Sequence, residues 1–263
     1  MKLVTYDDGR VGKVVDGTVI ELDVPDMRRY FELQGEVEPT GRETPLDQVH
    51  LRAPIIPKKF FHTAGNFREH HEESTRVNWS HPVLPWIVFF QNIDAIIGPD
   101  DPIIYPEGMT NELDYELELA VVIGKAGKFF SPEEAEDYIA GYIVFNDITA
   151  RDIQKSDGQW TRGKGWDTFC PTGPLVSNEI DPITTPVTLT THLNGTLRQT
   201  GSTADLIFPI PELLRYISAF MTLEPGDLIP TGTPSGVGPM QPGDLIQVSI
   251  PTLGILSNIL AAE

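Results

Sequence analysis

Two glutamates at alternate positions of an apolar segment are the residues best placed to do chemistry in this chain. Glu116 and Glu118 stand in the run NELDYELELAVVI, which predicts a β-strand. Because side chains alternate across a strand, both carboxylates would share one face with the apolar Ala120 and Val122. Carboxylates aimed at a buried face need protons or a cation, and oxygen ligands suit a hard divalent ion such as Mg²⁺. The alternative is a solvated acidic face at positions 112–118 of an edge strand.

A third carboxylate follows another apolar run. Asp147 follows Ile139–Phe145 after one intervening residue, at a strand end where ligand sites commonly form. If a helix or turn starts after Asp147, Arg151 and Gln154 lie beyond it on one face. Arginine and glutamine are suited to binding a carboxylate or a carbonyl. The alternative makes Asp147 a helix cap and Arg151 its partner at the surface.

The segment GNFREHHEE concentrates histidine and acid. His70 and Glu73 are three residues apart, so one helical turn would bring an imidazole beside a carboxylate that orients it, as in a general base. The spacing is not HExxH, which excludes a zincin. A plain exposed helix is the alternative.

A glycine-rich loop, Thr231–Gly238, could approach a ligand with its backbone. It lacks the GK[ST] ending of a phosphate-binding loop, and Pro239 disfavours the helix whose N-terminus would hold phosphate. A tight loop against a small ligand and a plain surface turn both fit the pattern.

Composition excludes several classes of function. The 263 residues include 19 Lys and Arg and 38 Asp and Glu, which gives a net charge of −19. Such a chain repels phosphate backbones and anionic lipids, so we expect no nucleic-acid and no membrane partner. The single cysteine, Cys170, excludes an internal disulfide and a multi-cysteine zinc site. No apolar run approaches the roughly 20 residues of a membrane span, and the first residues carry no secretory signal, so we expect a cytoplasmic protein.

The elements that must position these residues are mostly strands. Asp8-Gly9 and Asp16-Gly17 predict hairpins in a small N-terminal β domain, residues 1–50, and the polar stretch Gln34–Asp47 is expected to be a linker. In the second domain, residues 51–263, we expect strands at Ile87–Phe90, Tyr115–Ile123, Ile139–Phe145, Val187–Leu193 and Ile246–Ile250 and short helices at Ser131–Tyr138 and Pro211–Met221. Regular βαβ alternation is missing, which favours a mainly β or α+β fold.

Six segments in sequence order resemble the fumarylacetoacetate hydrolase superfamily: GNFREHHEE, DYELELAVVIGK, GYIVFNDITARDIQ, GKGWDTFCPTGP, LNGTLRQTGSTADLIF and LEPGDLIPTGTPSGVG. They cover roughly residues 57–260. The resemblance implies a mixed β-roll with a Mg²⁺ or Mn²⁺ site, in a homodimer. It implies action on 2-oxo or β-diketo acids by C–C hydrolysis, decarboxylation or enol–keto isomerisation.

The resemblance also assigns roles by position. The metal carboxylates are Glu116, Glu118 and Asp147, the general-base pair is His70 with Glu73, the substrate and oxyanion contacts are Arg151, Gln154 and Lys164, and the loop at the substrate carboxylate contains Thr231. Two positions depart from the family. Gln91 stands where a lysine is frequent, and Lys164 is followed by Gly165 instead of serine. The loss of a positive charge at Gln91 predicts a substrate whose distal end is neutral.

The expected function is therefore metal-dependent hydrolysis of a C–C bond in an acylpyruvate-like 2-oxo acid, because the His70/Glu73 pair supplies a base that activates water. The rivals are decarboxylation of an oxaloacetate-type acid and isomerisation of a 2-hydroxydienedioate of aromatic catabolism. A different class also fits the carboxylates: a non-enzymatic Ca²⁺-dependent ligand-binding β domain. Lys164 and His70 would have no role in such a domain.

Overall fold

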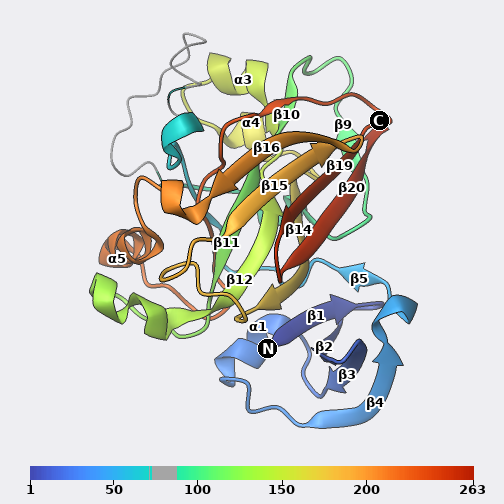
Figure 1. Cartoon of the computed structure of the whole chain (residues 1–263), viewed down its shortest axis with the longest axis vertical. Coiled ribbons are helices and arrows are strands. Elements are labelled where there is room, and N and C mark those ends of the chain that lie inside the picture. The colour runs from blue at the N-terminus through green and yellow to red at the C-terminus, as the bar shows by residue number, and fades with distance from the viewer. Residues whose placement is uncertain (71, 73–87) are drawn as a thin grey trace.

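Strands dominate the chain, which agrees with the mainly β, α+β fold expected from the sequence (Figure 1). The computed structural model describes residues 1–70, 72 and 88–263. Its strands form two large sheets and two small ones, joined by short helices.

The largest sheet contains ten strands. They are β1 (Lys2–Tyr6), β2 (Arg10–Val15), β3 (Thr18–Leu22), β4 (Pro39–Pro45), β5 (Leu51–Arg52), β8 (Ile96–Ile97), β11 (Leu117–Ile123), β12 (Ile139–Asn146), β14 (Cys170–Ser177) and β17 (Leu228–Pro230). Their order is β17-β11-β12-β14-β1-β2-β3-β4, with β5 beside β1 and β8 beside β14. Leu3 of β1 lies opposite Val176 of β14, so the N-terminal strands extend a sheet that also contains the acidic strand β11. The predicted division after residue 50 stays a prediction.

The N-terminal strands follow the local turn signals. Asp16 and Gly17 both have positive φ, 47° and 76°, as the hairpin between β2 and β3 requires. The predicted linker Gln34–Asp47 is wrong, because β4 lies within it and pairs with β3. Nearly every residue of β4 is exposed, so its sequence has no apolar alternation that could reveal a strand.

The second large sheet contains five strands. They are β9 (Ile103–Tyr105), β15 (Thr188–Leu193), β16 (Thr196–Ser202), β19 (Leu245–Ile250) and β20 (Gly254–Ala262), in the order β16-β15-β19-β20-β9. A three-stranded sheet joins β10 (Leu113–Tyr115), β13 (Thr149–Ala150) and β18 (Gly238–Pro239), and a two-stranded one joins β6 (Phe61–Thr63) and β7 (Val88–Phe90).

The two large sheets pack face to face, with β15, β19 and β20 against β11, β12 and β14 (Figure 1). Leu117, Leu119 and Val121 of β11 belong to the core between the sheets. Ala120 and Val122 belong to a second core on the other face, with residues of the N-terminal segment. The alternation places Glu118 on the face of Ala120 and Val122, as the sequence predicts.

The helices are short. They are α1 (Met27–Glu32), α3 (Arg151–Ser156), α4 (Thr161–Lys164) and α5 (Ile210–Phe220), with the 3₁₀ turns η1 (Leu46–Gln48), η2 (Ile93–Ala95), η3 (Pro132–Tyr138) and η4 (Thr203–Asp205). The helix expected at Ser131–Tyr138 is a 3₁₀ helix, and the Ser131 N–H donates to Glu134 as in a capping box. The helix expected at Pro211–Met221 is α5.

Candidate active site

Four carboxylates from two neighbouring parts of the fold meet in the interior. Asp114 is in β10, Glu116 lies between β10 and β11, Glu118 is in β11, and Asp147 directly follows β12. Their exposed fractions are 7%, 5%, 2% and 1%. Because β11 is hydrogen-bonded to β12 on one side and β17 on the other, the alternative of a solvated edge strand is wrong.

Backbone contacts hold these carboxylates in register. The Asp147 N–H donates to the carbonyl of Glu116 over 2.9 Å, and the Glu116 N–H donates to the side chain of Asn146 over 3.0 Å. The end of β12 is therefore fixed to the break between β10 and β11, so Glu116 and Asp147 lie at the same end of the sheet.

Arg151, the first residue of α3, reaches back into the cluster. Its Nε donates to Asp114 over 2.8 Å, a second guanidinium nitrogen donates to Glu116, and the third donates to Gln154 over 2.7 Å. The helix expected after Asp147 thus brings Arg151 and Gln154 together, and Asp147 is not its cap, since the N-cap is Ala150.

Lys164 ends α4 and places its ammonium group among the carboxylates. Its Nζ donates to Glu116 over 3.0 Å, to Asp147 over 2.5 Å and to the hydroxyl of Thr149 over 2.7 Å. These three contacts equal the three hydrogens of the ammonium group. Lys164 is 3% exposed, so the ion pairs lie away from solvent.

Glu118 differs from its neighbours because no lysine or arginine among the described residues forms an ion pair with it. Its carboxylate accepts a hydrogen bond from a backbone group, the Gly232 N–H at 2.6 Å. Burial and the negative charges of Asp147 and Glu116 raise the pKa of Glu118 well above its usual value. Burial also acts to raise the pKa of Glu116. The positive charges of Lys164 and Arg151 outweigh that effect and lower the pKa of Glu116 to about 2.

The charges of this cluster do not balance. Asp114, Glu116, Glu118 and Asp147 carry four negative charges when ionised, and Arg151 and Lys164 supply two positive ones. Uncompensated buried charge is costly, and one divalent cation would balance the remainder. The all-carboxylate donor set fits Mg²⁺ or Mn²⁺, with Glu118 as its most available ligand.

A histidine that the sequence analysis did not single out also belongs to this cluster. His62, in β6, is fully buried, and its Nδ1 lies 3.3 Å from Asp147 Oδ2. One ligand atom each of His62, Glu118 and Asp147 lie within 4.8 Å of one another. A histidine inside the apolar run FFHT has the appearance of an ordinary core residue, so only its distance from Asp147 in the fold reveals it.

Gln91 also contacts the cluster. Its amide nitrogen donates to the carbonyl of Lys164 over 2.9 Å and lies 3.3 Å from Asp147 Oδ1. The neutral side chain thus stands beside a carboxylate of the cluster. The predicted effect of Gln91 on the distal end of a substrate stays a prediction.

The predicted base lies at the cluster. His70 is 8% exposed, so the alternative of a plainly solvated residue is wrong for this side chain, and its charge contributes to lowering the pKa of Glu116. Glu73, its predicted partner, lies outside the described residues. The pairing of His70 with Glu73 therefore stays a prediction.

The glycine-rich loop meets the cluster through its backbone. Residues 231–234 are buried, so a plain surface turn is wrong for the start of this loop. Gly232, with φ of +100°, turns its N–H toward Glu118. The hydroxyl of Thr231 donates to the carbonyl of Leu119 over 2.9 Å, which fixes the loop against β11.

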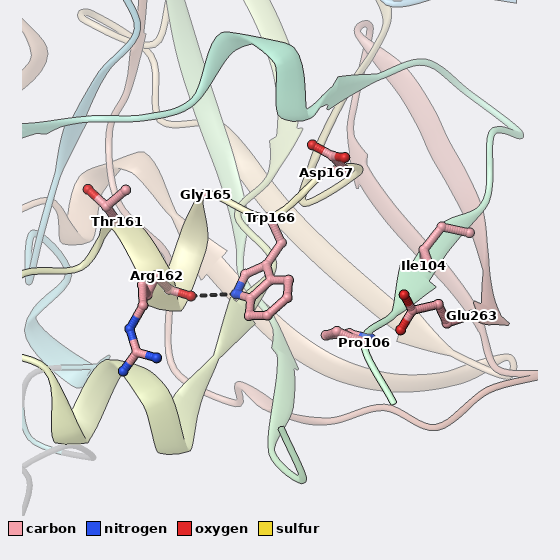
Figure 2. A pocket seen from close by; sticks show the side chains of 8 residues that line it. All are labelled: Ile104, Pro106, Thr161, Arg162, Gly165, Trp166, Asp167 and Glu263. Carbon is pink, nitrogen blue, oxygen red and sulfur yellow. Dashed lines mark hydrogen bonds between the residues drawn. The ribbon is translucent and has the colours of Figure 1, made fainter. Parts of the chain in front are cut away.

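A separate cavity of about 660 Å³ opens beside α4. Figure 2 shows Trp166 donating its indole N–H to the carbonyl of Arg162. Asp167 and Glu263 also line the cavity. None of the carboxylates described above lines this cavity, although Gly165 in its wall follows Lys164. The charged side chains that converge lie in the buried cluster, which is therefore the candidate active site.

Sequence and fold comparisons identify relatives of this chain. Residues 59–261 match the family model of the fumarylacetoacetate (FAA) hydrolase C-terminal domain. A Bacillus subtilis protein named oxaloacetate tautomerase is 45% identical, over 81% of this chain and 73% of its own. Among solved structures, a fumarylacetoacetate hydrolase of Exiguobacterium antarcticum is 35% identical with a TM-score of 0.88, and a 2-hydroxyhepta-2,4-diene-1,7-dioate isomerase of Mycobacterium marinum is 37% identical with a TM-score of 0.84. The first covers 100% of both chains, and the second covers 100% of this chain and 99% of its own.

The chain combines a β-rich fold with a buried centre of carboxylates. The chain belongs to the fumarylacetoacetate hydrolase family, as its motifs predict. The relatives named above are hydrolases, isomerases and tautomerases of this family. No helix among the described residues is long and apolar enough to cross a membrane. The cytoplasmic location stays a prediction.

Proposed function

We propose that this chain is a divalent-metal-dependent enzyme that interconverts the keto and enol forms of a 2-oxo acid. The observation that carries the proposal is the buried cluster of four carboxylates and two cations, which lacks two positive charges. Glu116, Glu118 and Asp147 would hold Mg²⁺ or Mn²⁺. The bound ion supplies the Lewis acidity that stabilises an enolate oxygen.

The chain's own residues divide the remaining tasks. His70, buried beside the cluster, is the proposed group that moves a proton at the carbon next to the keto group. Lys164 is the proposed cation at the developing oxyanion. Arg151 orients Glu116 and Gln154 through its hydrogen bonds, and Gln154 with the Thr231 loop is proposed to contact the substrate.

Tautomerisation is preferred over the hydrolysis expected from the sequence because of a named relative. The 45% identical Bacillus subtilis relative is named an oxaloacetate tautomerase, and oxaloacetate is a dianion. Gln91 is hydrogen-bonded within the cluster, to Asp147 and to the Lys164 carbonyl, and its predicted effect on such a substrate is tested by the panel below.

C–C hydrolysis is the second candidate, favoured by the position of His70. A base next to a metal centre can activate water toward a distal carbonyl as well as move a proton at carbon. Both reactions involve an enolate, but in hydrolysis it is the leaving group released when the C–C bond breaks after water adds to the distal carbonyl, whereas in tautomerisation it forms by loss of a proton. Decarboxylation would use the same enolate without an external base.

A substrate panel separates these reactions. With Mg²⁺, we expect the enzyme to accelerate keto–enol conversion of oxaloacetate, and His70→Ala to lower that rate by roughly 10²–10⁴-fold, the usual contribution of a general base. His50→Ala, at an exposed position outside the cluster and outside the five-stranded sheet, is the matched control and should leave the rate unchanged. The assay follows the enol absorbance.

The same panel includes acetylpyruvate and a 2-hydroxydienedioate. If the wild type releases acetate and pyruvate from acetylpyruvate and His70→Ala does not, the enzyme is a hydrolase and the proposed tautomerisation is wrong. Pyruvate formed from oxaloacetate and surviving His70→Ala would indicate a decarboxylase. No acceleration of any substrate with Mg²⁺ or Mn²⁺ would contradict the proposed function.

We also propose that the active form is a homodimer through the outer face of the five-stranded sheet. That face carries no formal charge; its residues are Ile104, Thr190, His192, Leu197, Thr200, Leu245, Gln247, Ser249, Ile255, Ser257, Ile259 and Ala261. Ile255 and Ile259 are 57% and 48% exposed. Two copies with 19 net negative charges each repel wherever acids meet, so an uncharged face suits a second copy of the chain.

Charge placed on this face should separate the subunits. We expect the wild-type chain to elute with twice the chain mass in light scattering, and the double variant Ile255→Lys/Ile259→Lys to elute as a monomer of unchanged circular dichroism. Phe129→Lys, at a residue 71% exposed between β11 and η3, is the control and should remain dimeric. A monomeric wild type, or a double variant that stays dimeric, would contradict this interface.

A further inference from the structure

We propose that His62 supplies a nitrogen ligand to the divalent cation, so that the metal centre combines carboxylate oxygens with one imidazole. The inference rests on the proposed metal centre and adds a ligand to it. Its consequence is a preference for Mn²⁺ over Mg²⁺, because imidazole binds the later divalent metals better than it binds Mg²⁺.

The spacing of the ligand atoms supports a shared ion. Nδ1 of His62 lies 3.3 Å from Asp147 Oδ2, and the ligand atoms of His62, Asp147 and Glu118 all lie within 4.8 Å of one another. Bonds of about 2.1 Å place neighbouring ligands of an octahedral ion roughly 3 Å apart and opposite ligands roughly 4 Å apart. The 4.8 Å limit is a little larger than the separation of opposite ligands, so a small inward shift of the side chains would bring all three atoms to one ion.

A simple hydrogen bond explains this contact less well. A charge-assisted N–H···O⁻ bond is about 2.7–2.9 Å long, which is shorter than the 3.3 Å observed. Asp147 Oδ2 already accepts from Lys164 over 2.5 Å, and Oδ1 faces Gln91. Glu118, which has no ion-pair partner among the described residues, completes the set that includes His62.

The surroundings of His62 hold its ring toward the cluster. Phe60, Phe89 and Phe145 lie around it with ring centroids 4.5–5.1 Å away. Nε2 is buried and has no hydrogen-bond partner in the part of the chain that the structure describes. Burying an imidazole among apolar side chains costs more free energy than burying an apolar side chain of similar size, unless its other nitrogen makes a strong bond. A bond from Nδ1 to the metal would be such a bond.

Electron–nuclear double resonance of the Mn²⁺-loaded full chain tests this ligand directly. With histidines labelled with ¹⁵N in the ring, we expect an imidazole nitrogen coupling in the wild type. The coupling should persist in the triple variant His70→Asn/His71→Asn/His81→Asn. Of the six histidines, this variant keeps His62 and two others, of which His50 is exposed and His192 lies on the outer sheet face.

Each outcome decides between the inference and the proposal beneath it. Bound Mn²⁺ without imidazole coupling in the wild type overturns the role of His62 and leaves the carboxylate centre intact. Coupling that disappears in the triple variant also overturns it. Failure of the wild type to bind Mn²⁺ at all contradicts the proposed metal centre itself. The wild-type and triple-variant spectra decide the matter even if a His62 variant does not fold.

Metal affinities give an independent measurement. In His62→Asn, we expect the Kd for Mn²⁺ to rise by roughly tenfold or more, and the Kd for Mg²⁺ to rise less, because a nitrogen ligand contributes more to Mn²⁺. His192→Asn is the matched control and should change neither value. Equal losses for both metals in isothermal titration calorimetry would contradict a nitrogen ligand.

Discussion

Replacing Glu118 with glutamine is expected to abolish metal binding and activity without destabilising the metal-free protein. Burial and the charges of Asp147 and Glu116 disfavour an ionised Glu118, which is why its pKa is raised. Glutamine removes that charge and keeps an oxygen to accept from the Gly232 N–H. The metal-free variant should therefore melt at or above the wild-type temperature, while its affinity for Mn²⁺ is lost.

Calorimetry with Mn²⁺ and a melting curve in EDTA check both halves of this prediction. Glu112→Gln is the control, because Glu112 is exposed and pairs with Lys155 at the surface, close to Asp114 in sequence. Stoichiometric Mn²⁺ retained by Glu118→Gln would contradict the assignment of this residue. A metal-free variant that melts well below the wild type would show that the ionised carboxylate stabilises the fold.

Replacing Lys164 with methionine has the second large expected effect, on both stability and rate. The change leaves Glu116 and Asp147 without the ammonium group that lies 3.0 and 2.5 Å from them. Removing one partner of a buried ion pair costs about 3–5 kcal/mol of unfolding free energy. Because the cluster becomes more negative, saturating Mg²⁺ should stabilise this variant more than it stabilises the wild type.

The catalytic part of the prediction is a fall in kcat of roughly 10²–10³-fold, as for the loss of one oxyanion donor. Urea unfolding with and without Mg²⁺ and steady-state kinetics measure the two effects. Lys155→Met, in the surface pair with Glu112, is the control and should change neither quantity. A Lys164→Met enzyme with wild-type kcat would exclude Lys164 from the chemistry.

The sequence predicts the centre of this site better than its surroundings. Glu116 and Glu118 are two residues apart, and period-two alternation predicts that they share a face, although Glu116 itself lies at the break between β10 and β11. Arg151 and Gln154 follow from helical spacing after Asp147. Lys164 has no such local signal, and only the resemblance to a family assigns it to the site.

Other members of the cluster depend on contacts between distant segments. His62 and Gln91 reach Asp147 from the two-stranded sheet and the chain that follows it, 85 and 56 residues away. His62 carries no sequence pattern that distinguishes it from a core histidine, and it becomes visible only once the strands are paired. Gln91 is singled out in the sequence only by its departure from the family resemblance.

The fold shows the same division between local and distant information. Asp16-Gly17 predicts its turn because positive φ is a local requirement, and both residues have it. The strand β4 could not be predicted, because hydrogen bonds to β3 form it and its side chains are almost all exposed. The pairing of β1 with β14 joins residues more than 170 positions apart.

Exchange of the protons next to the keto group tests the central claim most directly. In deuterated buffer with Mg²⁺, proton NMR should show the wild type removing the C3 proton signal of a 2-oxo acid such as oxaloacetate much faster than buffer with Mg²⁺ alone. The signal should persist when EDTA is added or when Glu118→Gln replaces the wild type. Exchange at the buffer rate, or equal exchange by Glu118→Gln, would contradict a metal-stabilised enolate at this cluster.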